Sequence, residues 1–369
     1  MPFRVSLPAL AVPTAVAKAL AVRRPASAEA TAVRRSFSDH LRQGYGGPPK
    51  LHAKVEGGSS QRRRKGRALR TARVALIVLA PVAAGAQGTG QSSYRTGIDL
   101  VSFTVTVVDR QGQPVSDLTG DDFEIREEGR AQRVQYFARE GDAEAAPLHV
   151  GLLFDTSGSM ENDLELTRTA AIKFLRLFPQ ALDLTFVDFS TEVRAARFSP
   201  ADFPRLVERI RNRPAKGYTA LYDALGMYLD GADQQTGRKV LVLYTDGGDS
   251  SSSQTWSDTL GILRASDVTV FPLGFMEHQS ASLRLHQESL LRQMADATGG
   301  RAFFPRSMKQ IDEMYADIAG EIHAQYSLGY VSSNPARDGK WRKVEVRLRP
   351  SQGRRLSVRT RKGYFAPIQ

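Results

Sequence analysis

The sequence predicts an α/β protein: a doubly wound, mostly parallel sheet inserted into a small β-sandwich-like unit that both flanks form together. Over residues 147–324, continuous apolar runs alternate with segments of helical periodicity, the pattern of an open parallel sheet with helices on both faces. The N-terminal flank, residues 98–140, instead begins with a segment rich in Val, Thr, Ile and Phe, and the C-terminal flank, residues 325–369, contains strands that alternate apolar and polar side chains, which is typical of half-buried strands. Each flank supplies only about three strands, too few for a stable sheet, so we expect the flanks to pair.

Composition and length bound the class of protein. The chain has 369 residues, enough for one large domain with accessories or for two ordinary domains. Apolar residues make up 41% and charged residues 24% of it, which excludes a wholly disordered, fibrous or polytopic membrane protein. Cysteine is absent, which excludes a disulfide framework, a thiol nucleophile and cysteine-ligated zinc.

The net charge of +12 is unevenly distributed along the chain. Residues 1–86 carry 16 Lys and Arg against three Asp and Glu, whereas the remainder carries 35 against 36. The basic character therefore belongs to the N-terminal leader, and the folded part is not expected to bind nucleic acid.

The leader contains a candidate export signal over residues 62–86. The basic stretch 62–73 precedes the apolar run 74–86, which ends on small residues at Ala84-Gly85-Ala86. Thirteen apolar residues are too few to span a hydrocarbon core of about 30 Å. We expect cleavage after Ala86, no transmembrane span in the mature chain, and export to the periplasm, outer envelope or extracellular space. An uncleaved anchor is the alternative.

Residues 1–61 precede this signal, although an export signal normally begins a chain. They are rich in Ala, Arg, Pro and Gly and lack a clear amphipathic period. We expect them to be disordered or to lie outside the translated protein; a later start requires a non-AUG codon, because no methionine lies between Met1 and Met160. Residues 87–97 form a Gly/Ser/Gln linker.

The N-terminal flank is predicted to hold a strand and a hairpin. Residues 98–108 are rich in Val, Thr, Ile and Phe, which favours a strand. Phe123–Arg126 and Arg133–Ala138 are expected to pair as a hairpin around the turn at 128–130. A Gly/Ala/Pro-rich boundary over 140–147 ends this flank.

The central segment then alternates strands and helices. Leu148–Phe154 is a continuous apolar run, typical of a strand buried on both faces. Further strands are expected at 182–189, 192–198, 239–245, 268–275 and 301–304. Helices are expected at 162–178, 202–212, 220–231, 256–266, 284–298 and 307–324. In the C-terminal flank, strands are expected at 325–332, 341–349 and 354–365.

A group of oxygen-bearing side chains follows the first buried strand. Asp155, Ser157 and Ser159 lie where that strand ends, the usual place for ligands in an open α/β sheet. Their alternating spacing allows a turning loop to point one carboxylate and two hydroxyls at one place. Oxygen ligands suit a hard cation such as Mg²⁺, but this short pattern also recurs by chance.

Two later loops strengthen the prediction of a metal site. Thr219 stands just before a predicted helix, and Asp246 ends a predicted strand. With these additions the chain resembles the von Willebrand factor type A (VWFA) domain over about residues 147–325. Asp155, Ser157, Ser159, Thr219 and Asp246 match, in order, the five positions of the metal-ion-dependent adhesion site (MIDAS) of that family.

The flanks extend this resemblance: the hairpin segment 122–137 and the closing segment 326–367 are similar to the exported VWFA-related proteins common in acidobacteria. The family implies a doubly wound sheet whose Mg²⁺ or Mn²⁺ captures a carboxylate from a partner protein. It also implies that Ser157, Ser159 and Thr219 bind the ion directly, and that Asp155 and Asp246 act directly or through water.

Each of these residues also has a purely structural interpretation. Asp155 and Ser157 are suited to capping a helix, Thr219 to capping the helix that follows it, and Asp246 to a plain turn. For any one residue the structural role is the better interpretation, but the five in order favour a metal site.

Tyr218, Asp249 and Ser250 are possible rim residues of a ligand site. Packing for Tyr218 and a solvated loop for the other two are the simpler interpretations.

These observations predict an exported, Mg²⁺- or Mn²⁺-dependent adhesion module without enzymatic activity, which binds a protein ligand through an exposed acidic residue. The alternatives are a structural envelope scaffold in which the ion only stabilises the fold, and a Mg²⁺-dependent hydrolase. The hydrolase is disfavoured because Ser157 occupies the place of the second acid in a phosphatase Asp-x-Asp pattern.

A second charged feature lies in the C-terminal strands. Residues 337–362 hold 11 Lys and Arg against Asp338 and Glu345. Such a face is able to meet an acidic partner, but docking against the rest of the chain is the favoured interpretation.

Overall fold

The computed structural model describes residues 100–349 and 354–368, which form three sheets and their connecting helices. The predicted leader (1–61), export signal (62–86) and linker (87–97) lie outside the described residues. None of the helices in the described part of the chain is long and apolar enough to cross a membrane.

The central sheet has five strands in the order β7-β6-β5-β8-β9. All neighbours are parallel except β7, which runs antiparallel to β6. The strand β5 lies in the middle, and all eight of its residues are buried, as its apolar run predicts. The strand bounds are β5 (Leu148–Asp155), β6 (Asp183–Phe189), β7 (Val193–Phe198), β8 (Arg238–Thr245) and β9 (Val268–Gly274).

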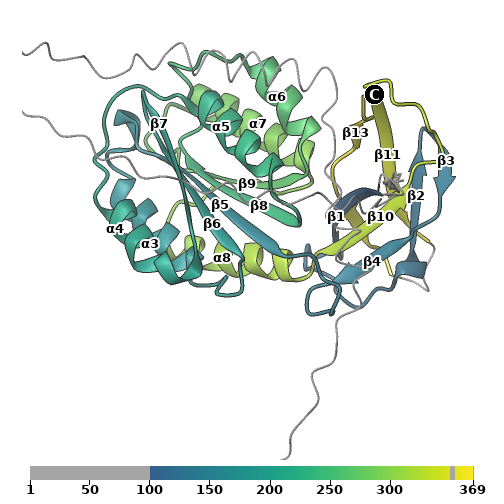
Figure 1. Cartoon of the computed structure of the whole chain (residues 1–369). Helices are drawn as coiled ribbons and strands as arrows, with labels where there is room; N and C mark the ends of the chain where they lie inside the picture. Colours follow the sequence, from purple (N-terminus) through teal and green to yellow (C-terminus); the bar gives the residue numbers. More distant parts are fainter. Residues whose placement is uncertain (1–99, 350–353, 369) are drawn as a thin grey trace, which may run out of the picture. The chain divides into compact units, whose positions relative to one another are not determined.

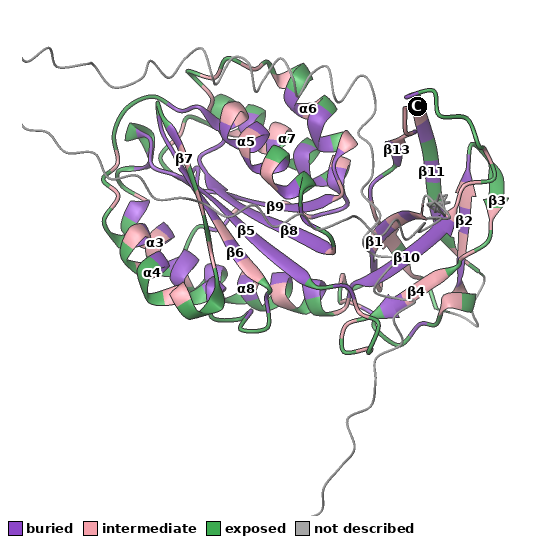
Figure 2. Cartoon of the chain, in the orientation of Figure 1, coloured by how far each residue is buried: buried purple, intermediate pink, exposed green. Residues whose placement is uncertain are grey.

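Helices cover both faces of this sheet (Figure 1). One face packs against α3 (Leu164–Leu175), α4 (Phe203–Arg211) and α8 (Met308–His323). The other packs against α5 (Leu221–Asp233), α6 (Trp256–Ala265) and α7 (Ala281–Thr298). Successive side chains of β5 enter opposite cores, Phe154 one and Leu153 the other, and Figure 2 shows the buried strands between the two helix layers. This is the predicted doubly wound, mostly parallel sheet.

The flanks form a separate pair of four-stranded sheets, ordered β12-β1-β10-β4 and β13-β11-β2-β3. Each sheet mixes strands from both ends of the chain, since β1 pairs with β10 and β2 pairs with β11. The predicted β-sandwich-like unit with an inserted α/β domain is therefore confirmed. The strand bounds are β1 (Leu100–Val108), β2 (Phe123–Glu127), β3 (Arg130–Gln132), β4 (Tyr136–Arg139), β10 (Tyr326–Val331), β11 (Trp341–Leu348), β12 (Ser357–Arg359) and β13 (Gly363–Phe365).

Two predicted strands of this unit differ from the structure. The predicted strand Arg133–Ala138 is wrong: β3 pairs with β2, and the chain then crosses to the other sheet, where β4 pairs with β10. The predicted strand 354–365 likewise splits into β12 beside β1 and β13 beside β11. The predicted strand 301–304 is reduced to a single bridge between Phe303 and Leu273.

Candidate metal-binding site

Three loops bring the predicted ligands to one edge of the central sheet. Asp155 is the last residue of β5, and Ser157 and Ser159 lie in the turn that follows, which contains a short 3-10 helix. Thr219 lies two residues before α5, and Asp246 follows the last residue of β8. Because β5 and β8 are parallel neighbours, their carboxyl ends meet at this edge.

Hydrogen bonds fix the side chain of Asp155. It is fully buried, and its Oδ1 accepts a hydrogen bond from the Ser157 backbone N at 2.9 Å. Its Oδ2 accepts a hydrogen bond from the Thr245 hydroxyl at 2.7 Å. The Oγ atoms of Ser157 and Ser159 lie 3.1 Å apart, so the two hydroxyls converge as the alternating spacing predicts.

The three loops are bonded to one another through their backbones. The Gly158 N donates to the Gly217 carbonyl at 3.0 Å, joining the first loop to the second. Thr219 N donates to the Ser250 hydroxyl at 2.9 Å, and Ser250 N donates back to the Thr219 carbonyl at 2.8 Å, joining the second to the third. Movement of one loop therefore disturbs the others.

Gly217 makes this junction possible. Its φ of +84° is in the left-handed region, which side chains rarely adopt. A Cβ at this position would stand 2.6 Å from the Thr191 hydroxyl oxygen, which itself accepts a hydrogen bond from Tyr218 N at 2.9 Å. Glycine thus permits the close packing of the second loop on the turn after β6.

Two acidic groups lie close together in this buried place without a positive partner. Burial, together with the nearby carboxylate of Asp246, raises the pKa of Asp155 to about 7. Asp246 is also buried. Within residues 100–349 and 354–368, neither carboxylate forms an ion pair with Lys, Arg or His. A bound cation would remove this electrostatic penalty.

The donor set suits a hard divalent cation. All five predicted ligands offer oxygen, and the two carboxylates balance the charge of one such ion. No three His, Asp or Glu side chains gather as a metal-binding group in the described part of the chain. The set depends instead on hydroxyl oxygens, from Ser157, Ser159 and Thr219, beside its two carboxylates.

The structural interpretations apply only in part. The side chain of Ser157 makes no capping bond, and Ala220 rather than Thr219 is the cap residue of α5. Asp246 does form a turn, since its Oδ1 accepts from Gly248 N at 3.1 Å. The start of α5 is held by another loop, in which the Ser252 hydroxyl accepts from Tyr222 N at 3.1 Å.

The three proposed rim residues differ in exposure and bonding. Tyr218 projects from the surface with 69% of its area exposed. Asp249 accepts from Ser252 Oγ at 2.6 Å and from Tyr222 N at 3.2 Å, so it serves the loop. Ser250 is bonded to Thr219, as described above. Only Tyr218 of the three presents a side chain free of such bonds.

Sequence reasoning missed Thr245 and Thr191. Thr245 orients the carboxylate of Asp155, and Thr191 anchors the loop that carries Thr219. No sequence signal separates these threonines from ordinary strand or turn residues, because both contacts join segments far apart in the chain.

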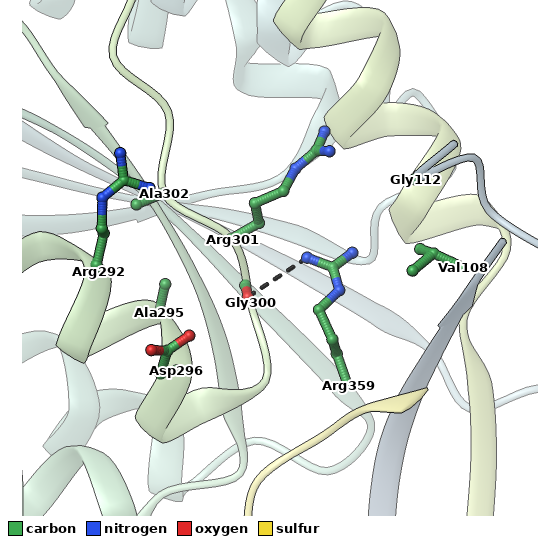
Figure 3. Close-up of a pocket in the computed structure, with 9 residues that line it drawn as sticks. All are labelled: Val108, Gly112, Arg292, Ala295, Asp296, Gly300, Arg301, Ala302 and Arg359. Carbon is green, nitrogen blue, oxygen red and sulfur yellow. Dashed lines mark hydrogen bonds between the residues drawn. The ribbon is translucent and has the colours of Figure 1, made fainter. Parts of the chain in front are cut away.

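The structure also has a pocket of about 410 Å³, whose lining residues are drawn in Figure 3. Phe303 bridges Leu273 near the end of β9, in parallel orientation. Gly300, which lines the pocket, comes three residues earlier, so the pocket lies toward the start of β9. Arg359 from the β unit donates to the Gly300 carbonyl at 3.5 Å. None of the five predicted ligands lines it. The lining residues are Val108, Gly112, Arg292, Ala295, Asp296, Gly300, Arg301, Ala302 and Arg359.

Three arginines of the basic C-terminal flank contact the rest of the chain. Arg359 bonds Glu321 of α8 at 2.5 Å, and buried Arg361 donates to the Ser266 carbonyl at 3.2 Å. Arg354 pairs with Asp117 at 2.9 Å. These contacts support the docking interpretation of the positive charge.

The central α/β domain matches a known protein family. Residues 149–317 match the model of the von Willebrand factor type A domain, so the chain contains a domain of that family. No curated protein matches the sequence.

Several solved structures are similar in fold. A von Willebrand factor type A protein from Catenulispora acidiphila is 13% identical, with a TM-score of 0.40, over 73% of this chain and 74% of that one. The PilB minor pilin from Streptococcus sanguinis is 14% identical, with a TM-score of 0.42, over 50% of this chain. The pilus adhesin SpaC from Lactobacillus rhamnosus GG is 13% identical, with a TM-score of 0.41, over 65% of this chain. The alignments span 63% of the pilin and 47% of the adhesin.

Proposed function

We propose that this chain is an exported protein-binding module, without enzymatic activity, that uses a Mg²⁺ or Mn²⁺ ion to capture an acidic side chain of a partner protein. The single observation that carries the proposal is the buried pair Asp155 and Asp246, which lies beside hydroxyl groups and has no positive partner among residues 100–349 and 354–368. A cation there compensates both charges at once.

In this proposal Ser157, Ser159 and Thr219 hold the ion through their hydroxyls, while Asp155 and Asp246 hold it directly or through water. When bound, the ion supplies an electrophilic position for an incoming carboxylate. The protein's own part is to keep the oxygens converged, through the bonds from Ser157 N and Thr245 to Asp155. Such fixed supporting contacts tune metal sites.

A structural scaffold is the second candidate. The bonds between Gly158 and Gly217 and between Thr219 and Ser250 join three loops around the same place. An ion there would stiffen this edge without any ligand. Under this alternative, removing the ion lowers the stability of the protein but changes no partner binding.

Titration calorimetry of Mg²⁺ and Mn²⁺ into the purified chain tests the site. We expect binding by the wild type, and a loss of affinity of at least about tenfold in Asp155→Ala, because the substitution deletes a ligand. Asp230→Ala is the matched control, since Asp230 is an exposed acid of α5 without an ion pair in the described residues. Equal binding by both variants would contradict the metal site.

Affinity capture separates the two candidate functions. The immobilised chain is exposed to envelope extracts of the native organism in Mg²⁺ and then in chelator, beside Asp155→Ala. The binding module predicts partners that elute with chelator and are absent from the variant. Partners retained equally in chelator and by the variant would favour the scaffold.

A further inference from the structure

A segment beside the candidate site has features that the metal site itself does not require. We call residues 211–218 the strap; it leads from the end of α4 to the loop that carries Thr219. The strap is bonded on both sides, because Lys216 N donates to the Thr156 carbonyl at 2.9 Å and Tyr218 N donates to Thr191 Oγ1 at 2.9 Å. Its backbone is therefore already ordered before any partner binds.

Three long side chains of the strap face solvent. Lys216 and Arg211 are exposed, and neither forms an ion pair within the described residues. Tyr218 is 69% exposed, although its neighbour Thr219 is buried at the site. A rigidly held, exposed aromatic residue gives a large contact area at a low entropic cost, which is why tyrosine is enriched at protein interfaces.

Positive charge also exceeds negative charge around Asp188 of β6, which the strap contacts through Arg213. Arg194, Arg209 and Arg213 surround the buried carboxylate of Asp188, at 3.5, 2.7 and 3.1 Å. Glu192, which pairs with Arg194, supplies the only second acid of this cluster within the described residues. Lys216 and Arg211 add to this surplus, so the potential near the strap is positive.

The side of the candidate site formed by the loop after β9 differs from the strap side in charge. The strap contacts the turn after β6, whereas Glu277 and His278 follow β9, on the far side of β5 and β8 in the sheet order. His278 Nε2 lies 3.8 Å from Asp163 Oδ1, which connects this loop with the end of the first site loop. Exposed Glu277 makes this side acidic. An acidic ligand that enters the site is therefore attracted toward the strap.

We propose that the strap is a second contact surface for the partner, and that it selects an acidic polypeptide segment with a second carboxylate and an apolar side chain close to the captured acid. This proposal rests on the proposed function. Lys216, with Arg211 beside it, attracts the second carboxylate, and Tyr218 packs against the apolar side chain. The strap thereby determines which acidic segments bind, while the metal site supplies the capture itself.

A polypeptide suits this surface better than an anionic polysaccharide. Sulfated chains need repeated cationic groups along their length, but exposed Glu161 in the first site loop and exposed Glu277 after β9 interrupt the positive surface at the site. The strap also offers one aromatic anchor next to a single point of capture. This is the arrangement expected for a short segment with a few strong contacts.

The test selects random dodecapeptides displayed on phage against the immobilised full chain in Mg²⁺, with elution by chelator. The enriched peptides are synthesised, together with forms in which the second acid is replaced by its amide. We expect enriched sequences to carry a second acid and an apolar residue near the captured acid. Replacing the second acid should weaken binding to the wild type about tenfold, as for a close charge pair at an interface.

Three variants complete this test. In Lys216→Glu the second acid should no longer favour binding, and in Tyr218→Ala affinity should fall about tenfold. Lys343→Glu, an equal charge change on exposed Lys343 of β11, should bind like the wild type. Unchanged Mg²⁺ titrations would show that the variants keep their fold and metal site.

Two kinds of result would overturn the proposal. Chelator-eluted peptides without a second acid, or with the same preference in Lys216→Glu, would reject the strap and leave the proposed function intact. Failure to select any metal-dependent peptide would contradict the proposed function, and the strap proposal with it. Binding of heparin to the chain in the presence of chelator, lost in Lys216→Glu, would assign the strap to a polysaccharide instead.

Discussion

Two buried aspartates on neighbouring strands of the central sheet differ in how their charge is compensated. Asp155 is the last residue of β5. Asp188 of β6 pairs in register with Phe154, the residue of β5 just before Asp155. Both side chains are fully buried. Asp188 is surrounded by Arg194, Arg209 and Arg213, whereas Asp155 has hydroxyl and backbone donors and a second acid nearby.

This difference separates a structural carboxylate from a candidate ligand. The arginines that pair with Asp188 come from β7, α4 and the strap. The carboxylate of Asp188 therefore holds these three elements to β6. Around Asp155 the protein provides no cation of its own within the described residues. We expect Asp188 to contribute to stability under all conditions. The effect of Asp155 on stability should depend on pH and on the divalent cation.

The largest effect is expected for Asp188→Ala. The variant leaves three arginines around a cavity without a carboxylate, and the free energy of unfolding should fall by about 3 kcal/mol, the lower end for a broken buried pair because the arginines reach solvent. Denaturant unfolding in chelator measures it. Mg²⁺ affinity of the folded variant should stay within a few-fold of wild type; a tenfold loss would show that the two aspartates are not independent.

Asp155→Asn should have the opposite effect on the metal-free protein. At pH 8 the wild-type carboxylate is largely ionised in a buried place, since burial raises its pKa to about 7. The neutral amide removes that penalty, and the free energy of unfolding should rise by about 2 kcal/mol. At pH 4 the wild-type group is already protonated when folded, and the gain should vanish. Destabilisation at pH 8 would contradict an uncompensated charge.

The pH profile of the wild type follows from the same group. Its folded pKa lies above the unfolded value of 3.8, so its contribution to stability is full below 3.8 and is lost as pH rises through about 7. Subtracting the profile of Asp155→Asn isolates this contribution. Mg²⁺ affinity should rise up to about tenfold per pH unit toward 7 and level off above it, because the proton competes with the ion. A flat affinity profile would exclude Asp155 as a ligand.

Thr245→Val should have the smallest effect. It removes the hydroxyl that donates to Asp155 Oδ2 and that accepts from Gly247 N at 3.0 Å. We expect the free energy of unfolding to fall by about 1 kcal/mol and Mg²⁺ affinity to weaken. Thr245→Ser keeps the hydroxyl and serves as the control; an equal loss in both variants would assign the effect to packing.

Much of the fold was predictable because its signals are local. The apolar run Leu148–Phe154 fixes a strand buried on both faces, and the helical periods between strands fix the layers. The errors lie where pairing depends on distant segments. Nothing near Arg133 indicates that the chain leaves β3 for the sheet of β10. Arg361 likewise contacts two distant segments, through bonds to Ser102 of β1 and to Ser266 at the end of α6.

The site divides in the same way. Asp155, Ser157 and Ser159 form one short pattern at the end of a buried strand, so the sequence predicts their convergence. The role of Thr245 and the exposure of Tyr218 depend on tertiary packing and had no signal in the sequence. The isolation of Asp155 from positive charge was equally invisible, because nothing in the sequence shows that Arg209 and Arg213 pair with Asp188.

The most direct test of the central claim is an anomalous diffraction map, at the manganese edge, from crystals of the chain grown with Mn²⁺. We expect one strong peak within about 2–3 Å of the hydroxyl oxygens of Ser157 and Ser159, close to Asp155 and Asp246. A map without a peak there at saturating Mn²⁺, or with Mn²⁺ bound only elsewhere, would contradict the claim that this buried acidic pair is built to receive a cation.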